Sequence, residues 1–173
     1  METLIFKKTG ILRREKDNLE QQLKVTITLS GKSVTIEGNP LDEYIASFVL
    51  EALTLGFSLK EALLLKDENI SFRKLQIRDF TRRKNIWDVR ARLIGTEGKT
   101  RRTLEEISDC IVVINENTVG LIGPANNIDN AVQAVINIIK GSKQSNVYRY
   151  LERMNAEQKK QEKGLGIKIK NKK

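Results

Sequence analysis

Alternating apolar and polar residues predict two β-hairpins in this chain. Apolar side chains occupy every second position of strands over 24–29 and 34–36, with a Ser-Gly-Lys turn between them. Strands over 110–114 and 118–122 have the same alternation and are joined by a Glu-Asn turn. Because alternate residues of a strand point to opposite faces, each hairpin should bury one face and expose the other.

A helix is predicted after each hairpin, because the apolar residues there change to helical spacing. The first begins at Pro40 and ends near Gly56, and the second follows Pro124 and ends at Gly141. Between the two copies, Ser58 precedes Glu61 by three residues, which predicts a capped short helix through Lys66. After Val147 the chain begins another helix, with Leu151 and Met154 on the same face as Val147.

The second hairpin has further elements upstream of it. We expect a strand over 71–79, a helix over 81–94 and a helix over 99–108, with a short glycine-bounded loop between the helices. The first copy is shorter at its front. This order predicts an α+β fold in which helices pack on one face of a three-stranded antiparallel sheet.

The chain repeats this pattern at a fixed offset of 85 residues. Val25 corresponds to Cys110, Gly38 to Gly123 and Gly56 to Gly141, and the apolar positions between them also match. This period is too long for a solenoid and suits two copies of one small domain. We therefore expect one domain over 1–68, a second over 69–155 and a basic, disordered tail over 156–173.

Composition excludes several classes of chemistry. Among the 173 residues there is no histidine and only one cysteine, so disulfides within the chain, most zinc sites and histidine-based catalytic pairs are ruled out. Glu105, Glu106 and Asp109 form an acidic cluster that we interpret as a solvated helix face, although a weak metal site is conceivable there. We expect no catalytic site, cofactor or metal. No apolar run is long enough to cross a bilayer, so we expect a cytoplasmic location without membrane contact.

Positive charge is concentrated in two segments. The formal net charge is +9, yet residues 73–102 carry +8 and residues 157–173 carry +5, which leaves a mildly acidic remainder. Arginine dominates the first segment, and its planar guanidinium suits phosphate and base recognition. These segments favour a polyanionic partner, with nucleic acid the leading candidate.

The loop Gly95–Gly98 lies between two predicted helices inside the most basic segment. Glycines let a backbone turn sharply and let a sugar-phosphate strand approach, and the amides of the following helix favour anions. This is the KH arrangement, in which a GXXG loop holds about four nucleotides of single-stranded RNA. A second match, Gly120–Gly123, spans a strand, so we interpret it as structural. A Walker A loop is excluded because Leu93 stands where its first glycine is required.

The predicted RNA contacts surround this loop. Arg90 and Arg92 should diverge on their helix, and so should Arg101 and Arg102, with one of these two on the phosphate and the other paired with Glu105 or Glu106. Trp87, Tyr148 and Tyr150 are interpreted as packing residues rather than base-stacking platforms. The full predicted set is Arg83, Lys84, Arg90, Arg92, Ile94, Gly95, Thr96, Glu97, Gly98, Lys99, Thr100, Arg101 and Arg102.

The run RARLIGTEGKTRRTLEEIS over 90–108 resembles the signature of a known family. It is that of the archaeal and eukaryotic two-KH-domain small-subunit rRNA-processing proteins, the partner of NOB family. The stretches GFSLKEAL over 56–63, VGLIG over 119–123 and VYRYLER over 147–153 also agree. The resemblance implies tandem type I KH domains that bind single-stranded rRNA near the 3′ end of the small-subunit RNA. It also implies partnership with the NOB endonuclease and, in archaea, with the alpha subunit of initiation factor two.

Two features depart from the family pattern. Glu97 stands in the loop where the family usually has a basic residue, so affinity should depend more on Lys99, Arg101 and Arg102. The first copy has no GXXG, because Arg13 replaces the second glycine, and we expect a degenerate KH fold there. Our main hypothesis is an RNA-binding ribosome assembly factor. The alternative is a protein-interaction scaffold that docks onto a processing nuclease or an initiation factor and binds RNA weakly and nonspecifically.

Overall fold

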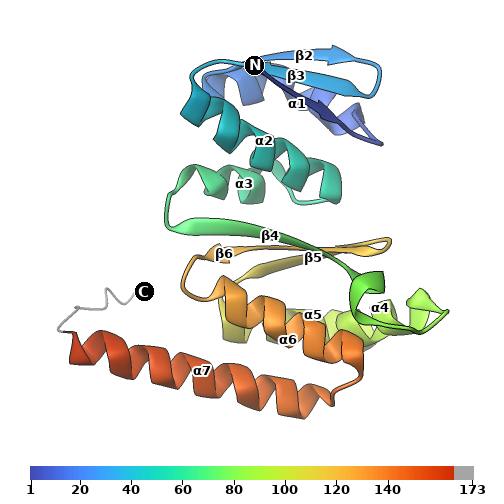
Figure 1. The fold of residues 1–173 in the computed structure, drawn as a ribbon, viewed down its shortest axis with the longest axis vertical. Helices are drawn as coiled ribbons and strands as arrows, with labels where there is room; N and C mark the ends of the chain where they lie inside the picture. Colours follow the sequence, from blue (N-terminus) through green and yellow to red (C-terminus); the bar gives the residue numbers. More distant parts are fainter. Residues whose placement is uncertain (166–173) are drawn as a thin grey trace.

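Two three-stranded antiparallel sheets and their helices form successive layers in the computed structural model, which describes residues 1–165 (Figure 1). The first unit contains β1 (Glu2–Ile5), α1 (Gly10–Leu23), β2 (Thr26–Ser30), β3 (Ser33–Glu37) and α2 (Pro40–Leu55). Its strand order is β1-β3-β2, with Glu2 opposite Ile36 and Ile27 also opposite Ile36. The predicted hairpin and the helix that follows it are confirmed.

A short connection joins the two units. Ser58 accepts a hydrogen bond from the Glu61 backbone N–H, and the Glu61 carboxylate accepts one from the Ser58 N–H, which confirms the predicted capping box. The helix α3 (Leu59–Ala62) then tightens into a 3-10 turn over Leu63–Lys66. This segment leads directly into the first strand of the second unit.

The second unit has the same strand order, β4-β6-β5, and one helix more before its hairpin. A 3-10 turn over Ile77–Phe80 follows its first strand. The elements are β4 (Ile70–Gln76), α4 (Ile86–Ile94), α5 (Lys99–Ser108), β5 (Ile111–Asn115), β6 (Thr118–Pro124), α6 (Ile128–Lys140) and α7 (Gln144–Gly164). The predicted α+β fold with three-stranded antiparallel sheets is therefore confirmed.

The two sheets differ in how many of their faces are buried. In the first, Ile27, Val34 and Ile36 are buried while Thr26 and Thr28 are exposed, so one face meets solvent. In the second, the central strand β6 is buried on both sides (Figure 1). The expectation that helices cover only one face is therefore incomplete for the second sheet, because α2 and α3 of the first unit cover its other face.

Glycine permits this second contact. A Cβ on Gly120 would lie 2.8 Å from Cε2 of Phe57, which is too close for a real contact. Ile122, on the same side of β6, is 1 % exposed and belongs to the apolar core of the first unit. Val119 and Leu121 point the other way into the core of the second unit. The apolar core of the first unit therefore extends onto one face of β6, and the core of the second unit lies on the other face.

The offset of 85 residues is a structural repeat. Lys24 and Asp109 both end a helix in the left-handed conformation, with φ of 57° and 54°. A Cβ added to Gly38 would lie 3.0 Å from Val25, and one added to Gly123 would lie 3.0 Å from the Cα of Cys110. The second glycine pair, Gly120–Gly123, thus has the packing role predicted for it.

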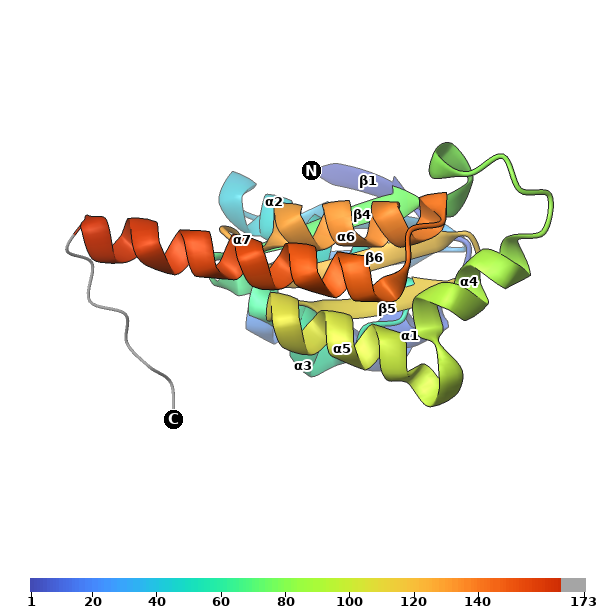
Figure 2. The same ribbon diagram turned by 90° about the horizontal axis from the view of Figure 1, so that it is seen from below.

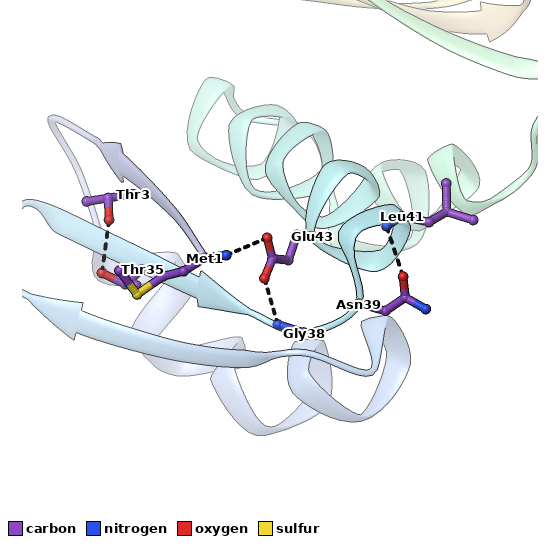
Figure 3. Close-up of polar contacts among 7 residues, drawn as sticks. All are labelled: Met1, Thr3, Thr35, Gly38, Asn39, Leu41 and Glu43. Atoms are coloured by element: carbon purple, nitrogen blue, oxygen red, sulfur yellow. Dashed lines mark hydrogen bonds and ion pairs between the residues drawn. The ribbon is translucent and has the colours of Figure 1, made fainter.

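A carboxylate ties the start of the first unit together (Figure 3). Glu43 accepts hydrogen bonds from the N-terminal amino group of Met1 and from the Gly38 N–H, each at 2.9 Å. These two bonds, the first being the larger cause, lower the pKa of Glu43. Asn39 caps α2 by accepting from the Leu41 N–H at 3.3 Å. The edge strand β1 is thereby anchored beside the helix that covers its sheet.

Four expectations need correction or limits. The short edge strand β1 was not predicted, and residues 81–85 precede α4 instead of forming its first turns. Residues 156–164 continue α7 and are not disordered, because Asn155 and Gln158 donate side-chain hydrogen bonds to the carbonyl oxygens of Ile107 and Asn126. The rest of the predicted tail, 166–173, lies outside the described residues. No helix within residues 1–165 has both the length and the apolar character to cross a bilayer.

Candidate nucleic-acid interface

The loop between α4 and α5 begins with a glycine that no other residue could replace without a clash. Gly95 has φ of 74°, and its N–H closes α4 by donating to the Ala91 carbonyl at 2.8 Å. A Cβ here would lie 2.7 Å from the backbone nitrogen of Thr100 and would also overlap the Thr100 hydroxyl. Thr100 is buried against this position, so its place in the predicted site is that of a packing residue.

The rest of the loop is a single 3-10 turn over Thr96–Gly98. Glu97 and Gly98 both adopt positive φ, at 52° and 74°, and the Gly98 N–H donates to the Gly95 carbonyl at 3.1 Å. No side chain caps the N-terminus of α5, which begins at Lys99. The loop therefore presents backbone and the positive end of the α5 dipole, a combination that favours anions.

The side chains at the tip are open to solvent. Thr96, Glu97 and Lys99 are exposed, and within residues 1–165 their side chains make no hydrogen bond or ion pair. Arg101 is half-buried. The carboxylate of Glu97 belongs to this exposed turn, and it would oppose a phosphate placed beside it.

Arg102 is held by the loop itself. Its guanidinium donates to the carbonyl oxygen of Glu97 and to that of Gly98, the latter at 3.5 Å. The predicted alternatives were a phosphate contact or a pair with a following glutamate. The pair with a glutamate does not form within residues 1–165, and the guanidinium instead braces the two left-handed residues of the loop.

Arg90 and Arg92 diverge, as their spacing predicts. Arg92 donates to the Ser142 carbonyl at 3.0 Å and so ties α4 to the turn between α6 and α7. Arg90 lies over the indole of Trp87, 4.8 Å from the ring centroid. Trp87 is 73 % exposed, so its interpretation as a packing residue is wrong. The apolar face of α4 is complete without it, because Val89 and Leu93 occupy the core positions.

Ile94 differs from the other apolar residues near the loop. It is half-buried and belongs to neither apolar core, so its side chain is available beside the glycines. Leu104 packs in the core of the second unit, whereas Ile111 and Val113 pack against the first unit. Tyr148 and Tyr150 also pack against the second core, as predicted.

A basic segment precedes α4. Arg82, Arg83 and Lys84 are exposed, and Asn85 caps the helix by accepting from the Trp87 N–H at 3.0 Å. This segment and the loop lie at the two ends of α4, on the side of the molecule opposite the free end of α7 (Figure 2). The structure thus brings most of the predicted set to one end of the molecule, but Arg92, Thr100 and Arg102 have structural partners there.

The first unit has no corresponding loop. Its helix α1 runs unbroken through residues 10–13, which match the glycine loop at the repeat offset. Leu12 is buried where the exposed Glu97 stands in the second unit. A single helix therefore replaces the two helices and the turn.

Other reactive groups are few in the described chain. Within residues 1–165 no group of three or more acidic or cysteine residues is placed to hold a metal ion. Cys110 is a buried core residue, like Val25 at the matching position of the first copy, and burial raises the pKa of its thiol to about 11. Its Sγ–H donates to the Ser108 carbonyl at 3.4 Å.

Comparisons with known proteins agree with this geometry. A family model described as a eukaryotic type KH domain (KH-domain type I) matches residues 71–156. A KH domain-containing protein of Methanocaldococcus jannaschii is 29 % identical over 157 residues, which cover 84 % of this chain and 69 % of that protein. A pre-rRNA-processing protein, pno1, of Emericella nidulans is 30 % identical over 114 residues, covering 64 % of this chain and 44 % of its own length.

Solved structures of a third relative cover nearly the whole chain. Dim2p from Pyrococcus horikoshii is 30 % identical, with a TM-score of 0.81, over 88 % of this chain and 98 % of that one. Its complex with a/eIF2alpha and rRNA gives 29 % identity and a TM-score of 0.82, over 90 % and 94 % of the two chains. The shared topology, the glycine loop and these identities lead to one conclusion: this chain belongs to the PNO1/Dim2 family of KH-domain proteins.

Proposed function

We propose that this chain is an RNA-binding ribosome assembly factor that grips single-stranded rRNA near the 3′ end of the small-subunit RNA. The observation that carries the proposal is the loop Gly95–Gly98, which lies at the positive end of α5 beside the exposed Lys99, with the exposed basic segment 82–84 at the other end of α4. Relatives described as a pre-rRNA-processing protein and as part of an rRNA complex support the choice of RNA. The role is binding, without catalysis.

The residues around the loop have different roles in this proposal. Thr96 and Gly98 leave room for the sugar-phosphate strand, and the amides of α5 and Lys99 hold a phosphate. Ile94 offers an apolar contact to a base. Arg102 and Thr100 hold the loop in shape, so they contribute to RNA affinity indirectly.

The sharpest test adds one negative charge to the loop without disturbing its fold. Thr96→Asp changes an exposed side chain that makes no contact, whereas a substitution at Gly95 would also clash. We expect at least a tenfold loss of affinity for a single-stranded oligonucleotide of the rRNA 3′ end, about the effect of 1.4 kcal/mol. The thermal midpoint should not change. Gln21→Glu, an exposed change of equal charge on α1, is the control.

Equal affinity of the wild-type protein and Thr96→Asp for this RNA would contradict the proposal. A second comparison tests the sequence preference, with an unrelated single strand of the same length as competitor. If both strands compete equally, the chain binds single strands in general and the assignment to the 3′ end is wrong.

We infer that residues 1–68 are a degenerate KH domain and that residues 69–155 are the RNA-binding one. The common strand order and the repeat offset support this division. Because α1 replaces the glycine loop in the first unit, that unit should not hold RNA in the KH manner.

A second function is favoured by the surface of the first unit. Leu41 and Tyr44 are 65 % and 60 % exposed on α2, and they line a groove of about 540 Å³ with Phe48 and Phe72. Such exposed apolar side chains are typical of protein contacts. We propose that this face binds a protein of the assembly pathway, either the alpha subunit of initiation factor two or the NOB endonuclease. Leu41→Asp should abolish capture of the true partner from a purified pair and leave RNA affinity unchanged.

A further inference from the structure

Trp87 is exposed at the entrance to α4, and nothing in the apolar core requires it. Its side chain is 73 % exposed, the highest value for any aromatic residue among the exposed large apolar side chains of the described chain. A large apolar ring left in water lacks the favourable transfer free energy that burial would give it. The exposure therefore calls for a partner outside the chain.

The ring lies on the same face of α4 as the apolar side chain beside the glycine loop. Trp87, Arg90 and Ile94 are spaced at i, i+3 and i+7, so they follow one stripe of the helix. Arg92 is about 140° away around the helix, and it faces the turn before α7. The stripe thus leads from the loop back toward the basic segment, over about 10 Å of helix.

Arg90 covers one face of the Trp87 ring and leaves the other face for a partner. Its guanidinium lies 4.8 Å from the centroid of the indole, which covers one face by a cation–π contact. The Nε atom of Arg90 is buried and has no hydrogen-bond partner within residues 1–165, which is an energetic cost. Arg90 thus lies over the indole even though its Nε–H has no acceptor. The opposite face of the indole stays open to solvent.

Charge decides what kind of partner fits this ring. Arg82, Arg83 and Lys84 are exposed directly before α4, and the described chain offers them no ion pair. A ring with one open face beside a row of cations is the combination that binds single-stranded nucleic acid, because bases stack on aromatic rings while cations hold the phosphates. An apolar protein surface would gain nothing from the three cations.

We propose that Trp87 is a stacking platform for one nucleobase of the bound RNA, outside the nucleotides held by the Gly95–Gly98 loop. The base lies on the open face of the indole, and Arg90 covers the opposite face. The segment 82–84 holds the phosphates that flank this base. The RNA site therefore extends along α4 as far as the basic segment. This inference rests on the proposed RNA binding and adds a second anchor to it.

The experiment uses the intrinsic fluorescence of Trp87, which is the only tryptophan of the chain. The full-length protein is titrated with a single-stranded oligonucleotide of the rRNA 3′ end, and the anisotropy of a labelled copy reports binding independently. We expect fluorescence to be quenched and protected from acrylamide with the same midpoint as the anisotropy change. Trp87→Ala should weaken binding between about 5-fold and 150-fold, and Trp87→Phe should restore most of the loss.

A scan with abasic nucleotides shows whether a base is the ligand. One abasic position should weaken binding to the wild-type protein and have no further effect on Trp87→Ala. Ile5→Ala, which removes an apolar side chain that is 80 % exposed on β1, is the control and should bind like the wild type. Thermal midpoints of all variants should agree, because neither side chain is part of a core.

The outcomes separate this inference from the proposed function. If anisotropy shows binding while Trp87 fluorescence and the affinity of Trp87→Ala are unchanged, the stacking platform is wrong and the ring serves a protein partner. If every abasic position affects Trp87→Ala as it affects the wild type, the ring contacts no base and the inference is also wrong. If the wild-type protein binds no RNA by anisotropy, the proposed function itself fails.

Discussion

The carboxylate of Glu105 accepts a hydrogen bond from the backbone N–H of Val112 at 2.9 Å and so fastens α5 to the start of β5. The first unit contains the equivalent bond, from the Ile27 N–H to Glu20 at 2.7 Å. In each pair the glutamate precedes the donor by seven positions, and the residue numbers of the second pair exceed those of the first by the repeat offset of 85. Each bond satisfies the backbone of an edge strand with a charged acceptor, and charged acceptors make the stronger hydrogen bonds.

Removal of this acceptor should destabilise the protein without altering the RNA site. Glu105→Ala leaves the Val112 N–H without its partner, and we expect the free energy of unfolding to fall by about 1–3 kcal/mol. Chemical denaturation measures the loss, and RNA affinity should not change. Glu20→Ala is the matched variant in the first unit and should cost a similar amount. A stability equal to that of the wild type in both variants would contradict this account.

The two glycines of the loop should respond differently to alanine. Gly95→Ala forces a Cβ against the Thr100 backbone, so we expect a loss of about 1–3 kcal/mol of stability together with weaker RNA binding. A Cβ on Gly98 would lie 4.0 Å from Nε of Arg102, an ordinary contact, so Gly98→Ala has only the strain of its positive φ, about 1 kcal/mol. Thermal denaturation distinguishes the two. Because the clash includes a backbone atom, Thr100→Ala should not rescue Gly95→Ala.

Lys99 and Arg102 should differ in the salt dependence of RNA binding. Lys99 is free to neutralise a phosphate, so Lys99→Ala should lower the slope of log affinity against log salt by about 0.7. Arg102 is held by loop carbonyls, so Arg102→Ala should weaken binding at every salt concentration with the slope unchanged. An equal change of slope in the two variants would show that Arg102 contacts RNA directly.

The buried thiol of Cys110 should make stability depend on pH in the alkaline range. The unfolded chain loses this proton near pH 9.0, whereas burial keeps the thiol protonated in the native state up to about pH 11. The native state therefore binds more protons between these values, and stability falls as the pH rises through them. The difference in unfolding free energy between the wild type and Cys110→Ala should be constant below pH 9.0 and change only above it. A constant difference up to pH 11 would contradict the burial effect.

Packing between the units can be tested at Gly120. A Cβ there overlaps Phe57, so Gly120→Ala should destabilise the whole chain by about 1–3 kcal/mol. Because Ile122 belongs to the core of the first unit, the two units should unfold in one transition, seen alike by far-ultraviolet circular dichroism and by Trp87 fluorescence. Separate transitions in the wild-type protein would show that packing of the first unit against β6 does not couple the units.

Local sequence determined most of the elements and the position of the loop. Alternation and helical spacing are properties of neighbouring residues, so the hairpins, α2, α5 and the Ser58 cap could be predicted from them. The glycines marked the turn for the same reason, since Gly95 and Gly98 adopt backbone conformations that few other residues tolerate. The offset of 85 residues also appeared directly in the sequence.

Tertiary structure alone decided which faces are buried and which side chains are free. Trp87 looked like a core residue by composition, but Val89 and Leu93 fill the core and leave the indole in solvent. In the sequence, Arg92 and Arg102 could not be distinguished from the arginines predicted to contact RNA. In the structure, Arg92 donates to the carbonyl oxygen of Ser142, which is distant in sequence, and Arg102 donates to that of Glu97 in the loop. Both faces of β6 are covered because a second unit packs there. Such contacts depend on residues far apart in the chain, and a local pattern carries no information about them.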